Sequence, residues 1–358
     1  MNVNFPLLKT IRILLLPFSV IYALVVFFRN WCFDKKILAS SSFNLPLICV
    51  GNLAVGGTGK SPMVEFLIKR LKNDFQIAIL SRGYKRKTKG YALATSDATA
   101  LDIGDEPMQF HSKFPDVTVA VGEERVVAIP QLLHDRPETK AIILDDAFQH
   151  RYVRAGLNIL LTEYNNLFTR DWFLPTGDLR DEKRSYKRAG IIVVTKCEPE
   201  LSLKEKNDLV KEIRPTENQQ IFFSSIRYGE AYHIITREPL RIDDSRDTLL
   251  VTGIANPKPL KDYLDKNSRE YDEMIYSDHY IFRIDDLKAI IKRFNNIESN
   301  NKIILTTEKD AVRLMKFAQE LRKLPFYVIP IEPHFLFGDE KRFTDLIVKF
   351  IRDFNYQT

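Results

Sequence analysis

The stretch that decides the fold of this chain is Ala54-Val55-Gly56-Gly57-Thr58-Gly59-Lys60-Ser61. It follows the apolar run 47–50 and precedes an apolar pattern over 62–68 that is typical of a helix. Backbone N–H groups of a glycine-rich loop between a strand and a helix point at phosphate oxygens, and the helix N-terminus adds partial positive charge. The sequence therefore predicts a nucleotide-phosphate site formed by residues 54–61.

Two side chains of this loop carry the chemistry. Lys60 can reach the outer phosphates of a nucleotide, and the Ser61 hydroxyl can bind Mg²⁺. The pattern departs from a strict Walker A motif at its first position, where Ala54 replaces glycine, but three glycines remain where the backbone must approach phosphate. An ordinary glycine-rich turn would not explain Lys60 and Ser61 in this position.

A second element supports the same reading. The apolar strand 141–144 is followed directly by Asp145 and Asp146. Ligands of open α/β sheets bind at the carboxyl ends of the strands, and P-loop enzymes hold Mg²⁺ there with a carboxylate. A pair of aspartates can be an ordinary turn, but together with the glycine-rich loop it predicts a magnesium site.

Composition limits the class of protein. A chain of 358 residues, 45% hydrophobic and 28% charged, has room for about two folded domains. The net charge of +6 indicates an anionic partner, and the basic cluster 82–89 is either a solvated loop or a surface for phosphate or acidic membrane. The three cysteines form no metal-binding pattern and no disulfide framework, which fits a reducing compartment.

The N-terminal region has an uncharged apolar run, 13–28, between Arg12 and Arg29. As a helix it would span about 24 Å, short of the roughly 30 Å hydrocarbon core, so we expect a helix seated in the membrane rather than a full crossing. A cleaved signal peptide and a buried helix of a soluble protein are the alternatives. The run lacks a cleavage site of the A-x-A kind.

Strand and helix patterns alternate along the first two thirds of the chain, which is typical of a parallel α/β sheet. We expect six apolar strands between residues 47 and 195, at 47–50, 77–80, 117–121, 141–144, 157–161 and 191–195. We expect a P-loop NTPase-like core with a mostly parallel sheet, a two-stranded connector and a smaller second α/β domain. The runs 220–228 and 231–236 around Gly229-Glu230 predict a hairpin as the connector. The predicted divisions are 1–36 for the membrane-associated helix, 37–219 for the P-loop domain, 220–242 for the linker and 243–358 for the second domain.

Several polar groups could add chemistry, and each also has a purely structural explanation. Asp105 and Glu106 lie in a turn that precedes a helix pattern, where a carboxylate could accept a hydroxyl proton or simply cap the helix. His279 sits between a strand and a helix pattern, and Arg180 lies in a loop where it could bind phosphate or face solvent. Residues 305–313 read as a strand end and a capped helix.

Three classes of function fit these features. A P-loop kinase with a membrane-resident substrate explains the loop, the acidic strand end, the apolar run and the basic cluster together. A GTPase is the main alternative, because Thr195-Lys196-Cys197-Glu198 resembles the guanine-reading Thr-Lys-x-Asp, although Glu198 replaces aspartate and no switch glycine follows Asp145. A nucleotide sensor or nucleic-acid-binding protein is less favoured, since recognition motifs for nucleic acid are absent from the sequence.

The motifs together resemble the tetraacyldisaccharide 4′-kinase family of lipid A biosynthesis, over nearly the whole chain. The matching segments are 51–53 with 55–62, 81–84, 104–107, 145–150, 278–279 and 307–312. The resemblance implies transfer of the γ-phosphoryl group of MgATP to the 4′-hydroxyl of a disaccharide 1-phosphate lipid at the cytoplasmic face of the bacterial inner membrane. It implies ATP and Mg²⁺ as cofactors and the lipid and the anionic membrane surface as partners, with no nucleic acid and no obligate protein partner.

The resemblance also implies roles for individual residues. Asp105 would take the hydroxyl proton, with His279 orienting or tuning it, and Lys60 would neutralise developing phosphate charge. Magnesium and nucleotide geometry would fall to Ser61, Glu106, Asp145 and Asp146. Candidates near the substrate or the phosphates are Tyr84, Arg125 and Arg180.

Overall fold

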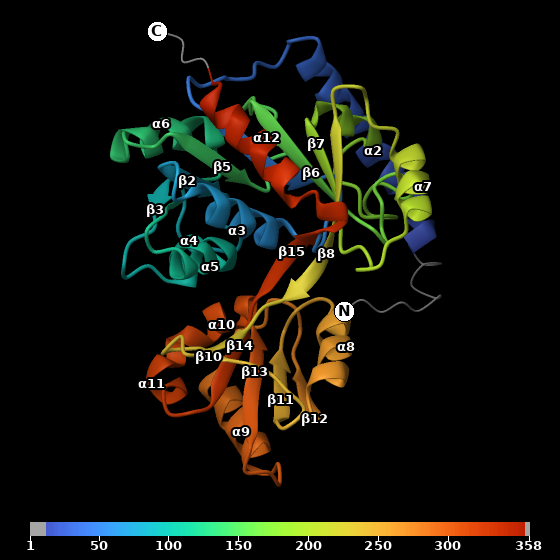
Figure 1. Ribbon diagram of the computed structural model, residues 1–358. Helices are drawn as coiled ribbons and strands as arrows, with labels where there is room; N and C mark the ends of the chain where they lie inside the picture. Colours follow the sequence, from blue (N-terminus) through green and yellow to red (C-terminus); the bar gives the residue numbers. More distant parts are fainter. Residues whose placement is uncertain (1–11, 355–358) are drawn as a thin grey trace. The chain divides into compact units, whose positions relative to one another are not determined.

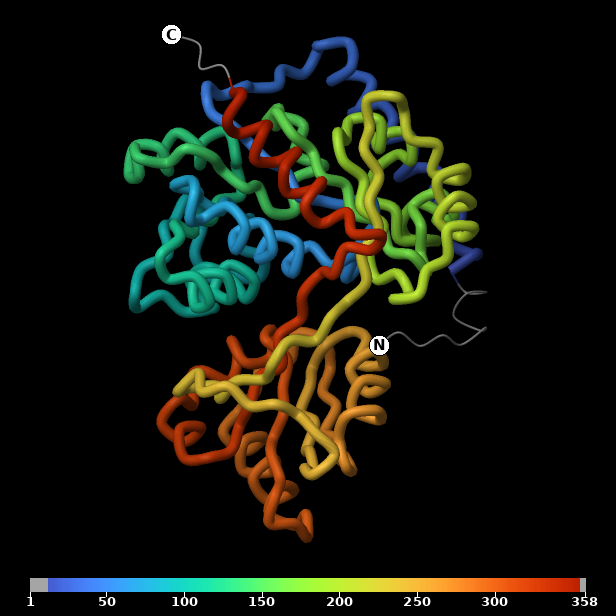
Figure 2. Tube along the Cα trace, viewed as in Figure 1, coloured from blue at the N-terminus to red at the C-terminus, as the bar shows by residue number. Residues whose placement is uncertain are grey.

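The structure is a computed structural model and describes residues 12–354 of the chain, which fall into two compact units. The P-loop unit comprises the described residues up to Arg227 together with those from Glu332 onward. The second unit is Tyr228–Ile331. The chain leaves the P-loop unit in strand β8 (Gln220–Tyr228) and returns to it in β15 (Ile331–Phe335), and Figure 2 shows these two strands, neighbours in one sheet, running side by side.

The P-loop unit is built on a nine-stranded sheet in the order β15-β8-β7-β6-β1-β5-β2-β4-β3 (Figure 1). Pairing is parallel from β8 to β4, and β3 runs antiparallel to β4. Its further strands are β1 (Leu47–Asn52), β2 (Ile77–Ser81), β3 (Ala92–Leu93), β4 (Thr118–Val121), β5 (Ala141–Asp145), β6 (Leu157–Glu163) and β7 (Ile191–Thr195). The chain continues from β1 to one side of the sheet and from β5 to the other, so β1 lies at the switch point where such sheets bind ligands.

Helices cover both faces of this sheet, which explains why its strands are continuously apolar rather than alternating. The helices of this unit are α2 (Leu16–Asp34), α3 (Lys60–Leu71), α4 (Ala100–Ile103), α5 (Asp105–Lys113), α6 (Arg125–Asp135), α7 (Leu203–Ile213) and α12 (Glu340–Arg352), with the 3₁₀ turns η1 (Lys183–Arg188) and η3 (Leu336–Gly338). Side chains of α3, α5 and α12 share one core with alternate residues of β1 and β5, and those of α6 and α7 share the core on the opposite face.

The second unit has a six-stranded sheet in the order β10-β9-β14-β13-β11-β12. Its strands are β9 (Ala231–His233), β10 (Pro239–Leu240), β11 (Asp247–Thr252), β12 (Glu270–Ile275), β13 (Lys302–Thr307) and β14 (Phe326–Ile329). Its helices are α8 (Lys258–Asn267), α9 (Ile284–Asn295), α10 (Glu308–Leu314) and α11 (Ala318–Leu321), with η2 (Met315–Phe317). The four strands from β14 to β12 are parallel, and α9 and α8 pack on opposite faces of them.

These features confirm the predicted α/β fold with a P-loop-like core and a smaller second unit. All six strands expected between residues 47 and 195 are present. The predicted hairpin is wrong, because β8 pairs with β7 in the first sheet, whereas β9 pairs with β14 and β10 in the second. Gly229-Glu230 therefore lies at the start of the second unit and does not form the turn of a hairpin, and the connector consists of β8 and β15.

The predicted division at 243–358 also differs from the observed one, since the chain returns to the P-loop unit at Glu332. The reason is the apolar face of α12. Phe343, Ile347 and Ile351 are buried in the same core as α3, and the ring of Phe343 lies 4.4 Å from that of Phe335 and 5.2 Å from that of Phe222, centroid to centroid. In Figure 1, α12 lies beside α3.

We expect Phe343→Ala to lower the free energy of unfolding of the P-loop unit by about 3–5 kcal/mol, because a fully buried ring leaves a cavity. Lys349→Ala, at an exposed position of the same helix, is the matched control and should change it by less than about 0.5 kcal/mol. Urea unfolding followed by tryptophan fluorescence and circular dichroism measures both. Equal stability of the two variants would mean that α12 is not part of this core.

Candidate functional site

The glycine-rich loop joins β1 to α3 as predicted. Gly56 and Gly59 have φ values of 113° and 84°, which residues other than glycine rarely adopt. Gly59 is the residue before α3, and no side chain caps that helix, so its first N–H groups face the loop. Ala54, at the position where the strict motif has glycine, forms a β-bridge with Leu179 and is tolerated there.

Two strand ends hold the loop in shape. The Asn52 side-chain amide at the end of β1 donates to the Thr58 hydroxyl at 3.0 Å, and the Thr195 hydroxyl at the end of β7 donates to the Thr58 carbonyl at 2.8 Å. Lys196, the next residue, lies close to the loop as well: its Nζ is 3.9 Å from where a Cβ on Gly57 would be, and 3.2 Å from Glu163 Oε1. The phosphate cradle is therefore fixed before any nucleotide enters.

One carboxylate, Asp146, joins two cations of the site, Lys60 and Arg180. Lys60 Nζ lies 3.7 Å from Asp146 Oδ1, and Arg180 donates to both oxygens of Asp146 at 2.7 and 3.2 Å. Arg180 also donates to Asn52 Oδ1 at 2.6 Å. Burial would raise the pKa of Asp146, but the charges of Lys60 and Arg180 outweigh it and bring the pKa to about 2. Two cations sharing one anion leave a positive charge beside the cradle.

Arg180 is held against the cradle by its own backbone. The Arg180 N–H donates to the Leu53 carbonyl at 2.8 Å, and the Val55 N–H donates to the Asp178 carbonyl at 2.7 Å. The loop that carries Arg180 therefore runs along the first residues of the phosphate cradle. These main-chain bonds make Arg180 part of the site, whereas the sequence left open whether it binds phosphate or faces solvent.

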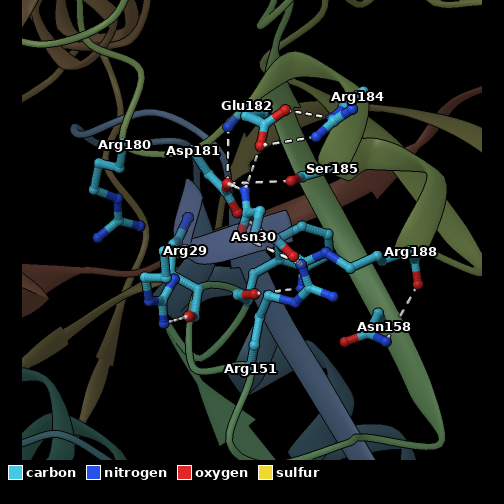
Figure 3. A network of polar contacts seen from close by, with 12 residues as sticks. Arg29, Asn30, Arg151, Asn158, Arg180, Asp181, Glu182, Arg184, Ser185 and Arg188 are labelled. Atoms are coloured by element: carbon cyan, nitrogen blue, oxygen red, sulfur yellow. Dashed lines mark hydrogen bonds and ion pairs between the residues drawn. The ribbon is translucent and has the colours of Figure 1, made fainter. Parts of the chain in front are cut away.

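The residues after Arg180 form a buried polar network with α2 (Figure 3). Asp181 Oδ1 accepts from Asn30 Nδ2 at 2.7 Å and from Ser185 Oγ at 3.1 Å, and Asp181 Oδ2 accepts from Arg188 Nη2 at 2.8 Å. Asn30 Nδ2 also donates to Glu182 Oε1 at 3.0 Å. The N-terminal helix is thus bonded to the segment that follows Arg180, a role for Asn30 that no sequence motif indicated.

The acidic strand end has the donor set of a magnesium site. Asp145 is 1% exposed; its Oδ2 accepts from Ser81 Oγ at 2.9 Å, whereas its Oδ1 has no hydrogen-bond partner among residues 12–354. Burial, followed by the charges of Glu106 and Asp146, raises the pKa of Asp145 to about 7. A buried carboxylate oxygen that lacks a partner fits an oxygen-seeking cation.

The predicted proton acceptor lies at the same edge of the sheet. Asp105 and Glu106 begin α5, directly after Gly104. Ser61 Oγ donates to Glu106 Oε1 at 3.0 Å, which joins the first turn of α5 to the first turn of α3. Asp105 therefore lies one residue from the partner of the P-loop serine. In the described part of the chain, no three His, Cys, Asp or Glu side chains form a complete metal cage, so Mg²⁺ would take its other ligands from phosphate and water.

The other predicted substrate residues differ in setting. Tyr84 is 65% exposed, with Lys85 Nζ 5.5 Å from the centre of its ring. Arg125 is buried, and its guanidinium donates to the Gly122 carbonyl and, at 3.5 Å, to the Asp145 carbonyl. Burial lowers the pKa of Arg125 to about 10. Arg125 thus supports the backbone of Asp145 through its carbonyl. Direct contact of Tyr84 or Arg125 with the substrate stays a prediction.

His279 belongs to the second unit, in the turn between β12 and α9. Its Nδ1 lies 3.1 Å from Arg313 Nη2, and its Nε2 lies 4.0 Å from Asp278 Oδ2. The backbone φ of His279 is 59°, in the left-handed region that is uncommon for a residue with a side chain.

Comparison with known proteins bears on the whole chain. A family model described as tetraacyldisaccharide-1-P 4′-kinase matches residues 11–352. The tetraacyldisaccharide 4′-kinase of Bacteroides thetaiotaomicron is 43% identical over 355 residues, covering 95% of this chain and 93% of that protein. The enzyme of the same name from Flavobacterium johnsoniae is 43% identical over 348 residues, covering 97% and 99%.

A solved structure is similar as well. The "apo" form of LpxK from Aquifex aeolicus, in complex with ATP, aligns with a TM-score of 0.74 and 27% identity, covering 95% of this chain and 99% of that one.

The buried Asp145 generates a prediction for the metal-free protein. Its pKa of about 7 lies above the ordinary 3.8, so its stabilising contribution is complete below about pH 4 and is lost as the pH rises through 7. Relative to Asp145→Asn, which cannot ionise, the wild type should lose about 2 kcal/mol between pH 5 and pH 8.

Thermal and urea unfolding at several pH values measure this difference. Asp116→Asn is the control, since the pKa of Asp116 is lowered and the group does not titrate in this range. A gap between the wild type and Asp145→Asn that stays constant from pH 5 to pH 8 would contradict the assignment. Added MgATP should stabilise the wild type more than Asp145→Asn.

Proposed function

The chain belongs to the tetraacyldisaccharide 4′-kinase family, and from this premise we propose how its residues carry out the reaction. The protein is an ATP-dependent kinase that phosphorylates the 4′-hydroxyl of a tetraacyldisaccharide 1-phosphate in lipid A synthesis. A GTPase is not favoured. The observation that supports our assignment of residues best is the sharing of Asp146 by Lys60 and Arg180 beside the glycine-rich loop.

We propose that the loop of residues 54–61 holds the triphosphate. Its N–H groups and the start of α3 bind the phosphate oxygens, and Lys60 contacts the outer phosphates. Lys60 and Arg180 together carry one positive charge more than Asp146 neutralises, so the site attracts an anion and can stabilise the charge that develops on the transferred group. The fixed positions of Asn52 and Thr195 keep the cradle in place during this step.

Magnesium would be held by Ser61 and Asp145, with Glu106 and Asp146 at its side. Bound there with ATP, Mg²⁺ would offset the charge of the phosphates and align them. Within the protein, Ser81 orients Asp145 through its hydrogen bond to Oδ2, which leaves Oδ1 for the metal. Glu106, in the first turn of α5, already accepts a hydrogen bond from Ser61, so the oxygens of both side chains lie beside the first turn of α3.

We further propose that Asp105 accepts the proton of the 4′-hydroxyl. The hydroxyl oxygen then bonds to the γ-phosphorus, the bond from that phosphorus to the bridging oxygen breaks, and ADP leaves. The place of Asp105 at the start of α5, next to the partner of Ser61, supports this role. We propose that His279 also takes part in the transfer.

Finally, we propose that α2 seats the enzyme on the membrane that holds its lipid substrate. Its polarity is inverted: Ser19 and Asn30 are buried, whereas Phe18, Val25 and Phe28 are each at least 60% exposed. Ser19 bonds to Phe173 and Thr176, and Asn30 to Asp181, so the polar side faces protein. A long helix that turns its apolar side outward would be unfavourable in water and favourable in a bilayer surface.

The proton-acceptor role predicts that Asp105→Asn lowers kcat by about 10²–10⁴-fold, while the KM for ATP changes less than about threefold, because the cradle is untouched. Steady-state assays with ATP, Mg²⁺ and the lipid in detergent micelles measure both constants. Asp116→Asn, an exposed aspartate paired with Lys72 in the same unit, is the matched control. A kcat for Asp105→Asn within threefold of the wild type would rule out this role.

Membrane seating predicts that replacing Phe18, Val25 and Phe28 together by serine weakens partitioning onto vesicles by about 10³-fold, at roughly 1.5 kcal/mol for each side chain. Flotation with phosphatidylethanolamine and phosphatidylglycerol vesicles measures it. The control replaces Val127, Leu203 and Ile281, three exposed apolar residues outside α2. Salt at about 1 M screens the attraction between surface charges. Complete release of the wild type from vesicles by this salt alone would show that apolar insertion is not what holds it.

A further inference from the structure

The segment 305–313, which the kinase mechanism above does not use, contains a buried carboxylate that accepts hydrogen bonds from several elements. Asp310, in the first turn of α10, is fully buried. Its Oδ2 accepts from the hydroxyls of Thr252 and Thr307 at 3.0 and 2.7 Å and from the Gly253 N–H at 3.0 Å. The strand end of β11 and the start of α10 are thereby fixed to one another.

The other oxygen of Asp310 fixes an arginine. Arg313 Nη1 lies 3.1 Å from Asp310 Oδ1, and the side chain of Arg313 is only 5% exposed. Arg313 Nη1 also donates to the Gly253 carbonyl at 3.5 Å. In such a dry setting a charge-paired guanidinium has little freedom, so its second terminal nitrogen has a defined direction.

That second nitrogen reaches His279. Arg313 Nη2 lies 3.1 Å from His279 Nδ1. A guanidinium has donors only, so Nδ1 must be the acceptor, and the ring proton is then on Nε2. If the His279 ring were protonated on both nitrogens, its Nδ1–H would face the N–H of the Arg313 guanidinium, and this hydrogen bond could not form. While this contact lasts, His279 offers a hydrogen-bond donor at Nε2, on the side where Asp278 lies.

The backbone around His279 is shaped for this contact. The residue has a φ of 59°, and the Tyr280 N–H closes the turn by donating to the Ser277 carbonyl at 3.1 Å. A Cβ on Gly253 would lie 3.0 Å from the Ser277 carbonyl and 3.3 Å from Asp310 Oδ1, closer than most real contacts. A residue without a side chain at 253 therefore lets the His279 turn pack against the Asp310 centre.

We propose that Arg313, held by Asp310, is a positioning residue for His279: it fixes the orientation of the imidazole and keeps the proton on Nε2. His279 then serves the phosphoryl transfer as a hydrogen-bond donor through Nε2, and it does not accept a proton at Nδ1. This inference rests on the participation of His279 proposed above. Thr307, Asp310 and Arg313 thereby gain a function beyond capping α10.

The test is the imidazole ¹⁵N spectrum of the full-length enzyme in detergent micelles, with the signals of His279 assigned by their loss in His279→Asn. We expect the Nε2–H tautomer in the wild type and a mixed or reversed pattern in Arg313→Met. The kcat of Arg313→Met should fall about 10²-fold, as expected for a misplaced group, with the KM for ATP unchanged within threefold. Arg313→Lys, which keeps the positive charge and N–H donors but lacks the planar fork, should recover part of the activity.

Arg293→Met is the matched control, since it removes an exposed arginine paired with Asp272 in the same unit and should change neither spectrum nor rate. An Nδ1–H tautomer in the wild type overturns the proposal, even if Arg313→Met fails to fold. Wild-type kcat in a folded Arg313→Met, with His279→Asn inactive, overturns the positioning role alone. Full activity of His279→Asn instead overturns the participation of His279 proposed earlier, and the ¹⁵N spectrum still reports the tautomer separately.

Discussion

The site depends on one shared charge. Asp146 follows β5, beside β1, and binds both Lys60 of the phosphate cradle and Arg180 of a distant loop. Without it, two cations would repel each other at the same strand edge. With it, the cradle and the loop after Leu179 form one preorganised surface, in which Lys60 and Arg180 carry one positive charge more than Asp146 neutralises, a charge that favours a bound triphosphate.

The same loop connects the nucleotide site to α2. Arg180 contacts the cradle, and the next residue, Asp181, binds Asn30 in the C-terminal part of α2. The Tyr22 hydroxyl also donates to the Arg180 carbonyl at 3.1 Å. The helix proposed to rest on the membrane is therefore part of the scaffold of the phosphate site. A lipid kinase would gain from this arrangement, because the helix proposed to seat it on the bilayer is bonded to the segment that places Arg180 beside the glycine-rich loop.

Local signals in the sequence were enough for the P-loop, the six strands between residues 47 and 195 and the acidic strand end, because each depends on neighbouring residues. Long-range pairing was not predictable. The runs 220–228 and 231–236 have the pattern of a hairpin, yet they pair with strands far away in the sequence. The amphipathic pattern of α12 could not tell which core it joins, and Asn30, just after the apolar run 13–28, gave no sign of Asp181, its partner 151 residues away.

The most direct test of the account is where the phosphate goes. The enzyme is incubated with γ-labelled ATP, Mg²⁺ and a tetraacyldisaccharide 1-phosphate, and the lipid is examined by ³¹P and ¹H NMR and by mass spectrometry. The account predicts one labelled phosphate on the 4′-oxygen with the wild type and none with Lys60→Ala. Label found only in inorganic phosphate, or equal labelling by Lys60→Ala, would contradict it.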